Sequence, residues 1–346
     1  MTGPSELRRD PAGGHWVIIA PGRANRPDEF EARPVRRGAG SPAACPFCSG
    51  REDCTPPEVA AIRPSGSAPD GPGWSVRVVP NKFPAVERSD RPAEPRSAGL
   101  FQSREGVGVH EVVIETPDHG ADFPSLSPAA AGAVVRTWRD RLRALEGGAA
   151  CAYVQLFKNH GREAGASLSH AHSQIVALPV VPGRIRSEID AAVRFRAEHG
   201  ACLHCRVLAE EAAAGRRMIL SDADHAVTAP FASRFPYEMH IHPRRHGARF
   251  AAIGDEEAEA LGGLLRTVLG RLRRSLDDPP FNLILHQAPS GRPDDPSFEA
   301  ESRAYHWHFE ILPVLTRVAG FEWGTGIHIN PVPPEKAASL LGRDSA

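Results

Sequence analysis

The chain has 346 residues, of which 41% are hydrophobic and 24% charged, and its formal net charge is -1. This is the composition of a globular protein with a large core, and it excludes a generally basic nucleic-acid wrapper. No apolar run approaches the roughly 18–20 residues of a membrane helix, and the first ten residues lack the apolar segment of a secretion signal. We therefore expect a cytoplasmic protein without membrane or nucleic-acid partners, with two domains at roughly 100–200 residues per domain.

Short apolar and β-branched runs predict strands at 74–79, 111–115, 152–157, 175–178, 226–229, 281–285 and 306–312. Two longer patterns predict helices over 127–145 and 255–276, with Ser127 capping the first. Segments rich in Pro, Gly, Ser and Arg, at 31–44, 62–73 and 88–99, predict loops or disordered insertions. Strands followed by one helix and further strands predict an α+β fold with mainly antiparallel sheets.

Three motifs occur twice in the same order along the chain. Residues 111–123 and 238–250 share a Glu, an Ile three positions later, and the sequence His-Gly-Ala-x-Phe at the end. Each copy follows a C-x-x-C pair, Cys45/Cys48 or Cys202/Cys205, and precedes an H-x-H pair, His170/His172 or His306/His308. Recurrence of three motifs in order predicts two homologous halves, residues 1–195 and 196–346.

The repeated cysteines and histidines predict metal sites. A structural zinc ion needs four Cys or His ligands, and a C-x-x-C supplies two of them from one turn. The repeat nominates Cys45, Cys48, His119 and His170 in the first half, and Cys202, Cys205, His246 and His306 in the second. A redox C-x-x-C is the alternative, but such motifs belong to a βαβ unit that the predicted element order lacks. Cys54 and Cys151 have no counterpart in the repeat and are predicted not to be ligands.

The alternating residues His170, His172 and Gln174 would point to one face of a strand. If His170 binds zinc, His172 is free, and a neutral imidazole can attack phosphorus and be displaced again. Gln174 could donate to a phosphate oxygen, and the small, polar loop 158–167 would admit an anion. A second metal site that uses both histidines is the alternative that spacing leaves open. Two arginines that could bind phosphate lie near the N-terminus, Arg23 and Arg26.

Residues 165–174, Gly-Ala-Ser-Leu-Ser-His-Ala-His-Ser-Gln, resemble the H-P-H-[GS]-Q motif of the galactose-1-phosphate uridylyltransferase family in the histidine-triad superfamily, with Ala171 replacing Pro. The resemblance runs nearly end to end, from 16–21 to 324–330. It implies two histidine-triad-like halves, each a mainly antiparallel sheet with packed helices, and a homodimer. It also implies that His172 is the nucleotidylated residue and that Gln174 stabilises the covalent intermediate. The implied contacts are Arg26, Asn159 and Ser167 to the phosphates, and Phe47 and Asn81 near the nucleobase and ribose.

For the second metal site the resemblance offers two ligand sets. One branch uses the Cys202, Cys205, His246 and His306 set. The enterobacterial type has an iron-like site whose matching residues here are Glu188, His286, His306 and His308. The two sets share His306 and cannot both be filled. We favour the cysteine set because thiolates bind zinc strongly, so the expected cofactors are one or two zinc ions, with iron the alternative at the second site.

The resemblance implies a ping-pong reaction. His172 would take the uridylyl group from UDP-glucose, aided by a backbone carbonyl that holds its distal ring proton, and pass it to galactose 1-phosphate. A related adenylyltransferase branch, which acts on ADP-glucose with phosphate as acceptor, shares the H-x-H-S-Q form. His328 stands where enterobacterial members have a hexose-binding Glu, so the sugar is left open. A zinc-dependent nucleic-acid-binding module is a further alternative that the neutral charge disfavours.

Overall fold

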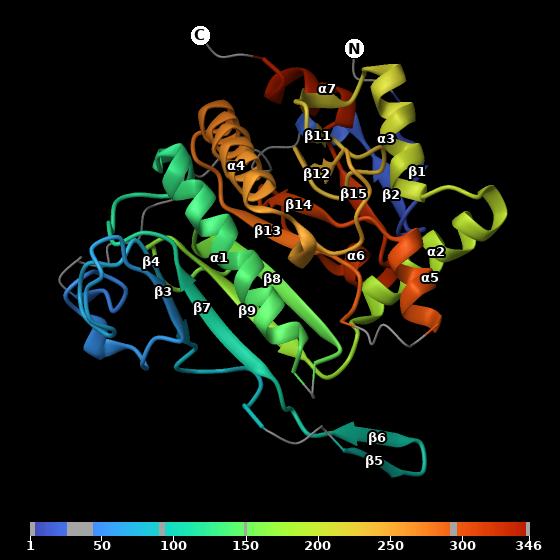
Figure 1. Ribbon diagram of the computed structural model, residues 1–346. Coiled ribbons are helices and arrows are strands. Elements are labelled where there is room, and N and C mark those ends of the chain that lie inside the picture. The colour runs from blue at the N-terminus through green and yellow to red at the C-terminus, as the bar shows by residue number, and fades with distance from the viewer. Residues whose placement is uncertain (1–3, 26–43, 90–93, 149–150, 291–295, 344–346) are drawn as a thin grey trace.

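The computed structural model describes residues 4–25, 44–89, 94–148, 151–290 and 296–343. Its centre is a ten-stranded sheet in the order β10-β11-β12-β14-β13-β8-β9-β7-β4-β3, in which every neighbouring pair is antiparallel (Figure 1). The predicted α+β class with an antiparallel sheet is therefore confirmed. The strands are β3 (Ala60–Ile62), β4 (Val76–Pro80), β7 (Val109–Ile114), β8 (Tyr153–His160), β9 (His172–Leu178), β10 (Met218–Ser221), β11 (His225–Thr228), β12 (Met239–Pro243), β13 (Phe281–His286) and β14 (His308–Pro313).

The strand order repeats from each edge of the sheet to its middle. In both halves three strands of this sheet are followed along the chain by a long helix and then by two more strands. The last strand of each half lies between the two that precede it in the chain: β9 lies between β7 and β8, and β14 lies between β12 and β13. The two five-stranded groups join where β8 pairs with β13, with Asn159 opposite Asn282. Strands from before and after residue 195 therefore belong to one continuous sheet. The division into two homologous domains at residue 195 stays a prediction.

Two long helices, α1 (Pro128–Glu146) and α4 (Asp255–Leu276), lie side by side on one face of the sheet (Figure 1). Both predicted helices are confirmed, and the Ser127 hydroxyl accepts from the Ala130 N–H at 3.2 Å as the predicted cap. The helices approach closely because glycines meet at their contact. A Cβ on Gly262 would lie 2.6 Å from the backbone nitrogen of Gly132. Fully buried apolar side chains fill the layer below, including Trp138, Leu142, Leu156, Leu265, Leu285 and Phe309.

A second, smaller sheet and the shorter helices lie around the second half of the large sheet (Figure 1). A three-stranded sheet combines β1 (Glu6–Arg9), β2 (Trp16–Ile19) and β15 (His328–Asn330), with β15 parallel to β2. The first strands of the chain are thus held by its last strand. The shorter helices are α2 (Gly183–His199), α3 (Leu203–Ala214), α5 (Pro296–Ala304), α6 (Gly320–Thr325) and α7 (Pro334–Leu341). The 3-10 turns are η1 (Pro21–Asn25), η3 (Glu52–Cys54), η4 (Phe123–Ser125), η5 (Arg162–Ala164) and η6 (Phe250–Ala252).

The loop prediction for 88–99 is wrong at its end, where β5 (Pro95–Ala98) pairs with β6 (Phe101–Arg104) in a hairpin that projects from the body (Figure 1). Every residue of both strands is exposed, so the apolar alternation that marks a strand in a sequence is absent. The predicted loop at 62–73 is confirmed after its first residue, and 31–43 lies outside the described residues. Among the helices that the structure describes, none has both the length and the apolar character needed to cross a membrane.

Candidate active site and metal centres

The first cysteine pair meets two histidines. His170 Nδ1 lies 3.6 Å from Cys45 Sγ and 3.7 Å from Cys48 Sγ, and His119 Nδ1 lies 3.4 Å from Cys48 Sγ. A tetrahedral zinc ion, with Zn–S of about 2.3 Å and Zn–N of about 2.0–2.1 Å, would separate sulfur and nitrogen ligands by about 3.5 Å. The four predicted residues of this group therefore have the spacing of a metal site.

The surroundings of this group favour a bound cation. The His170 Nε2–H donates to the Thr116 carbonyl oxygen at 2.7 Å, which leaves the Nδ1 lone pair directed at the thiols. Burial and the neighbouring Cys45 thiol raise the pKa of Cys48 to about 11. Two thiols this close ionise together only beside a positive charge, so the residues present fit a metal ion.

The second cysteine pair is built on a helix terminus. Cys202 is the N-cap of α3 and Cys205 lies in its first turn, where the helix dipole favours thiolates. His306 Nδ1 lies 3.9 Å from Cys202 Sγ and 3.4 Å from Cys205 Sγ, and His246 Nδ1 lies 3.8 Å from Cys205 Sγ. The structure thus brings together the four residues of the favoured set.

The competing set is divided. Glu188, His286 and His308 lie close enough to share an ion, and Glu188 Oε2 accepts from His286 Nδ1 at 2.9 Å. The remaining member, His306, instead points its Nδ1 at the thiols.

His172 begins β9 and is 7% exposed. Its Nδ1–H donates to the His170 carbonyl oxygen at 2.8 Å, so Nε2 keeps its lone pair. The sequence analysis expected a backbone carbonyl to hold the distal ring proton of His172, and the His170 carbonyl is such a group. Burial lowers the pKa of His172 to about 4, which keeps the ring neutral near pH 7. The Phe47 ring packs edge-on 5.4 Å away. A neutral imidazole of fixed tautomer is suited to nucleophilic attack.

A buried lysine supports the strand that carries His172. The Lys158 ammonium donates to the His172 carbonyl oxygen at 3.1 Å and to Glu115 Oε2 at 2.8 Å. Both side chains are buried, so this ion pair fixes the backbone at the start of β9. The sequence pattern placed Lys158 in the predicted loop 158–167, but this is wrong at its start, because residues 158–160 belong to β8 and the Lys158 side chain is buried. Glu115 had no predicted role, because a single Glu carries no spacing signal.

The Gln174 amide is held by two polar side chains. Its Oε1 lies 2.9 Å from His110 Nε2 and 3.5 Å from Asn81 Nδ2. His110 Nδ1 accepts from the Ala85 N–H at 3.1 Å, which places the ring proton on Nε2 as a donor to Gln174. Sequence reasoning placed Asn81 near the ligand but missed His110, whose contact arises from the pairing of β7 with β9.

The other predicted substrate contacts are more dispersed. Asn159 lies two residues beyond Phe157, the partner of Gln174, so it shares their face of the sheet, and its Oδ1 accepts from Asn282 at 2.8 Å. Ser167 is exposed in the loop before β9. Arg23 lines a separate cavity of about 1010 Å³ together with His328. Arg26 lies outside the described residues.

The chain is similar to known proteins along nearly its whole length. The family model described as galactose-1-phosphate uridyl transferase, N-terminal domain, matches residues 2–182, and a model of a domain of unknown function matches 126–341. ADP-glucose phosphorylase of Arabidopsis thaliana is 36% identical over 97% of this chain and 92% of its own length. Galactose-1-phosphate uridylyltransferase of Thermotoga maritima is 31% identical over 97% of both.

Solved structures agree as well. The crystal structure of an Arabidopsis thaliana ADP-glucose phosphorylase with bound ADP-glucose superposes with a TM-score of 0.83 at 34% identity, covering 99% of this chain and 100% of that one. A uridylyltransferase structure gives 0.72 at 31% identity and covers 97% of both chains. With a family model over half of its residues and relatives above 30% identity along nearly its whole length, the chain belongs to the galactose-1-phosphate uridylyltransferase family of nucleotidyltransferases.

Proposed function

We propose that the protein moves a nucleotidyl group from a nucleoside diphosphate sugar to a phosphate-bearing acceptor through a covalent intermediate on His172. The observation that carries the proposal is the His172 tautomer, with Nδ1–H bonded to the His170 carbonyl and Nε2 left to react. The proposed donor is UDP-glucose. The proposed acceptor is galactose 1-phosphate, which the name of the Thermotoga maritima relative, a galactose-1-phosphate uridylyltransferase, contains.

In the first step the Nε2 lone pair of His172 forms a bond to the α-phosphorus of UDP-glucose. The bond from this phosphorus to the bridging oxygen breaks, and glucose 1-phosphate leaves with the electron pair. In the second step a phosphate oxygen of galactose 1-phosphate attacks the same phosphorus, the N–P bond breaks, and neutral His172 returns. The His170 carbonyl stabilises the positive ring of the intermediate through the Nδ1–H, and the Gln174 amide donates to a non-bridging oxygen.

Substrate contacts are proposed for the residues around this pair. Phe47 and Asn81 would flank the nucleoside, since the first packs on His172 and the second touches the Gln174–His110 pair. Asn159 and Ser167 would contact the phosphates. Phosphate binding by Arg23 and Arg26 stays a prediction. The homodimer and the cytoplasmic location also stay predictions.

We assign the metal a structural role. Cys45, Cys48, His119 and His170 would hold one zinc ion, and Cys202, Cys205, His246 and His306 a second. Zinc bound by four protein ligands has no open position for substrate, so its contribution is to fix the chain. In the first group it would fix His170, whose carbonyl holds the His172 ring.

A second candidate keeps the same histidine and changes the substrates, so that ADP-glucose donates AMP and inorganic phosphate accepts it. It is favoured by the 36% identity to ADP-glucose phosphorylase and by the superposition on a structure that holds ADP-glucose.

Intact-protein mass spectrometry after incubation with UDP-glucose, with ADP-glucose in parallel, separates these candidates. A UMP adduct that disappears on addition of galactose 1-phosphate supports the uridylyltransferase. An AMP adduct that phosphate removes supports the second candidate instead.

The His172→Ala variant should form neither adduct. His199→Ala, which alters an exposed histidine in the last turn of α2, should label like the wild type. Absence of any adduct in the metal-loaded wild type, or labelling that survives in His172→Ala, would overturn the proposal.

A further inference from the structure

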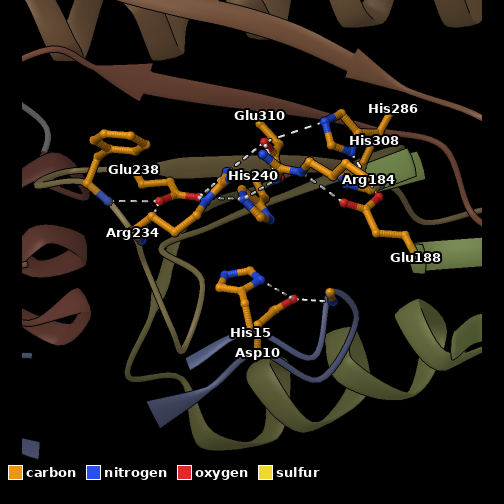
Figure 2. Close-up of polar contacts among 12 residues, drawn as sticks. Asp10, His15, Arg184, Glu188, Arg234, Glu238, His240, His286, His308 and Glu310 are labelled. Carbon is orange, nitrogen blue, oxygen red and sulfur yellow. Dashed lines mark hydrogen bonds and ion pairs between the residues drawn. The ribbon is translucent and has the colours of Figure 1, made fainter. Parts of the chain in front are cut away.

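A cavity of about 50 Å³ lies between the loop that joins β1 to β2 and the second half of the sheet. Figure 2 shows Asp10 and His15 of this loop facing His240, Arg234 and Glu310 across it. One water needs about 10–15 Å³ of such space, so an ion and a bound water would fit here.

Three buried histidines meet at this cavity. His204 comes from the first turn of α3, His242 from β12 and His308 from β14, and each is at most 5% exposed. One ring nitrogen from each lies within 4.8 Å of the other two. The sequence analysis gave His204 and His242 no role.

The three rings lie close together. Their centroids are 4.9 Å apart for His204–His308, 4.9 Å for His242–His308 and 5.3 Å for His204–His242. The histidine pairs of the two cysteine groups are 5.3 and 5.2 Å apart and nearly perpendicular, at 89° and 78°, whereas the His242 and His308 rings are stacked at 19°. His204 Nδ1 and His242 Nε2 are 3.2 Å apart, close to the roughly 3.3 Å between two nitrogens on a tetrahedral zinc ion.

The two nitrogens of each ring have different surroundings. His308 donates its Nδ1–H to the His306 carbonyl oxygen at 3.1 Å, which leaves the Nε2 lone pair at the cavity. Among the described residues, no group bonds to His204 Nε2 or His242 Nδ1, although both atoms are buried. These are the ring nitrogens opposite the 3.2 Å contact, so each would carry the ring proton if His204 Nδ1 and His242 Nε2 bound an ion.

The carboxylates around the cavity already have partners. Three buried carboxylates, Glu188, Glu238 and Glu310, face two guanidinium groups, Arg184 and Arg234 (Figure 2). The arginines already occupy the carboxylates: Glu310 accepts from Arg184 at 2.8 Å and from Arg234 at 2.7 Å. Glu238 likewise accepts from Arg234 at 2.9 Å and lies 3.0 Å from His240 Nε2, so the uncommitted lone pairs belong to the imidazoles.

We propose that His204, His242 and His308 bind a further metal ion, a divalent first-row transition metal such as zinc, with a fourth position open to the cavity. Neutral imidazole suits these metals, and three such ligands leave room for a water. This set shares only His308 with the Glu188 set considered above. The ion ties the first turn of α3 to β12 and β14.

The site uses the second copy of the H-x-H strand. His308 donates to the carbonyl of His306 as His172 does to that of His170, so it has the same tautomer. The first copy is free to react, whereas the second becomes a ligand because His204 and His242 converge on it.

The test counts metal in the full-length protein after loading with Zn²⁺ and removal of loosely bound ions. We expect about three zinc ions per chain in the wild type and about two in His242→Gln, because one imidazole ligand is lost. His240→Gln is the matched control, since it alters a histidine of the same strand at the same cavity, and it should keep the wild-type count. The proposal would be overturned if the wild type held only two zinc ions. It would also be overturned if the third ion were lost in His240→Gln or His286→Gln but kept in His242→Gln.

Cobalt loading of the wild type tests the site without a variant. Thiolate-bound Co²⁺ absorbs strongly through sulfur-to-metal charge transfer, which nitrogen ligands do not provide. The proposal therefore expects an equivalent of Co²⁺ that adds d–d absorption without charge transfer. If all tightly bound Co²⁺ shows the thiolate signature, the three histidines are a hydrogen-bonded cluster and hold no metal.

Discussion

The His110 Nε2–H donates to Gln174 Oε1 across 2.9 Å, while the other ring nitrogen of His110 accepts from the Ala85 backbone. This chain of two hydrogen bonds fixes which end of the Gln174 amide is committed to the protein. The carbonyl end faces His110 and the NH2 end is left to donate. An amide held in this way needs no reorganisation when charge develops on a phosphate oxygen.

His110→Phe should therefore slow nucleotidylation of His172 by roughly 10–100-fold, as expected when a group that orients a reacting residue is lost. Single-turnover labelling with the active nucleotide sugar measures the rate, and KM should change little, since the ring acts through Gln174. His110→Gln retains an N–H donor and should recover much of the rate. If His110→Phe and His110→Gln label at the same rate as each other, His110 does not position Gln174.

Lys158 and Glu115 form a buried ion pair at 2.8 Å. Lys158→Met leaves the Glu115 carboxylate buried without its partner and should lower the free energy of unfolding by about 3–5 kcal/mol. Urea unfolding measures this change. Lys158→Met combined with Glu115→Gln removes both charges and should recover part of the loss, and a double variant as unstable as the single one would contradict this account.

Gly262 lies where α4 crosses α1, and an added Cβ would meet backbone atoms of Ala131 and Gly132 at 2.6–2.9 Å. Backbone cannot rotate away as a side chain can, so the helices must separate. Gly262→Ala should therefore lower stability by about 1–3 kcal/mol. Its neighbour is the control, because a Cβ on Gly263 meets nothing within 4 Å. Gly263→Ala should gain up to about 1 kcal/mol from helix propensity. Thermal midpoints of the two variants should move in opposite directions.

The parts of this structure that the sequence predicts are those with local or repeated signals. The helices α1 and α4 follow from the 3.6-residue period, and the two cysteine groups follow from motifs that occur twice. Contacts between distant segments are not predictable in this way. The pairing of β2 with β15 joins residues about 310 positions apart, and the exposed β5–β6 hairpin carries no apolar pattern. His110, Lys158 and His204 were missed for the same reason, since each gains its role only when strands or a helix end converge.

Metal removal should uncouple the first cysteine group from the nucleophile. His170 places its ring in the first cysteine group and its carbonyl at the Nδ1–H of His172, so a protein stripped of the proposed zinc should lose control of the His172 tautomer. We expect chelation to lower both the thermal midpoint and the rate of His172 labelling, and Zn²⁺ to restore both. Cys48→Ser should match the stripped protein and resist rescue by Zn²⁺. Cys54→Ser, whose thiol contacts only Arg51 and Asp53 among the described residues, should behave as the wild type. Full labelling by the Cys48→Ser variant would show that His172 works without the metal group beside it.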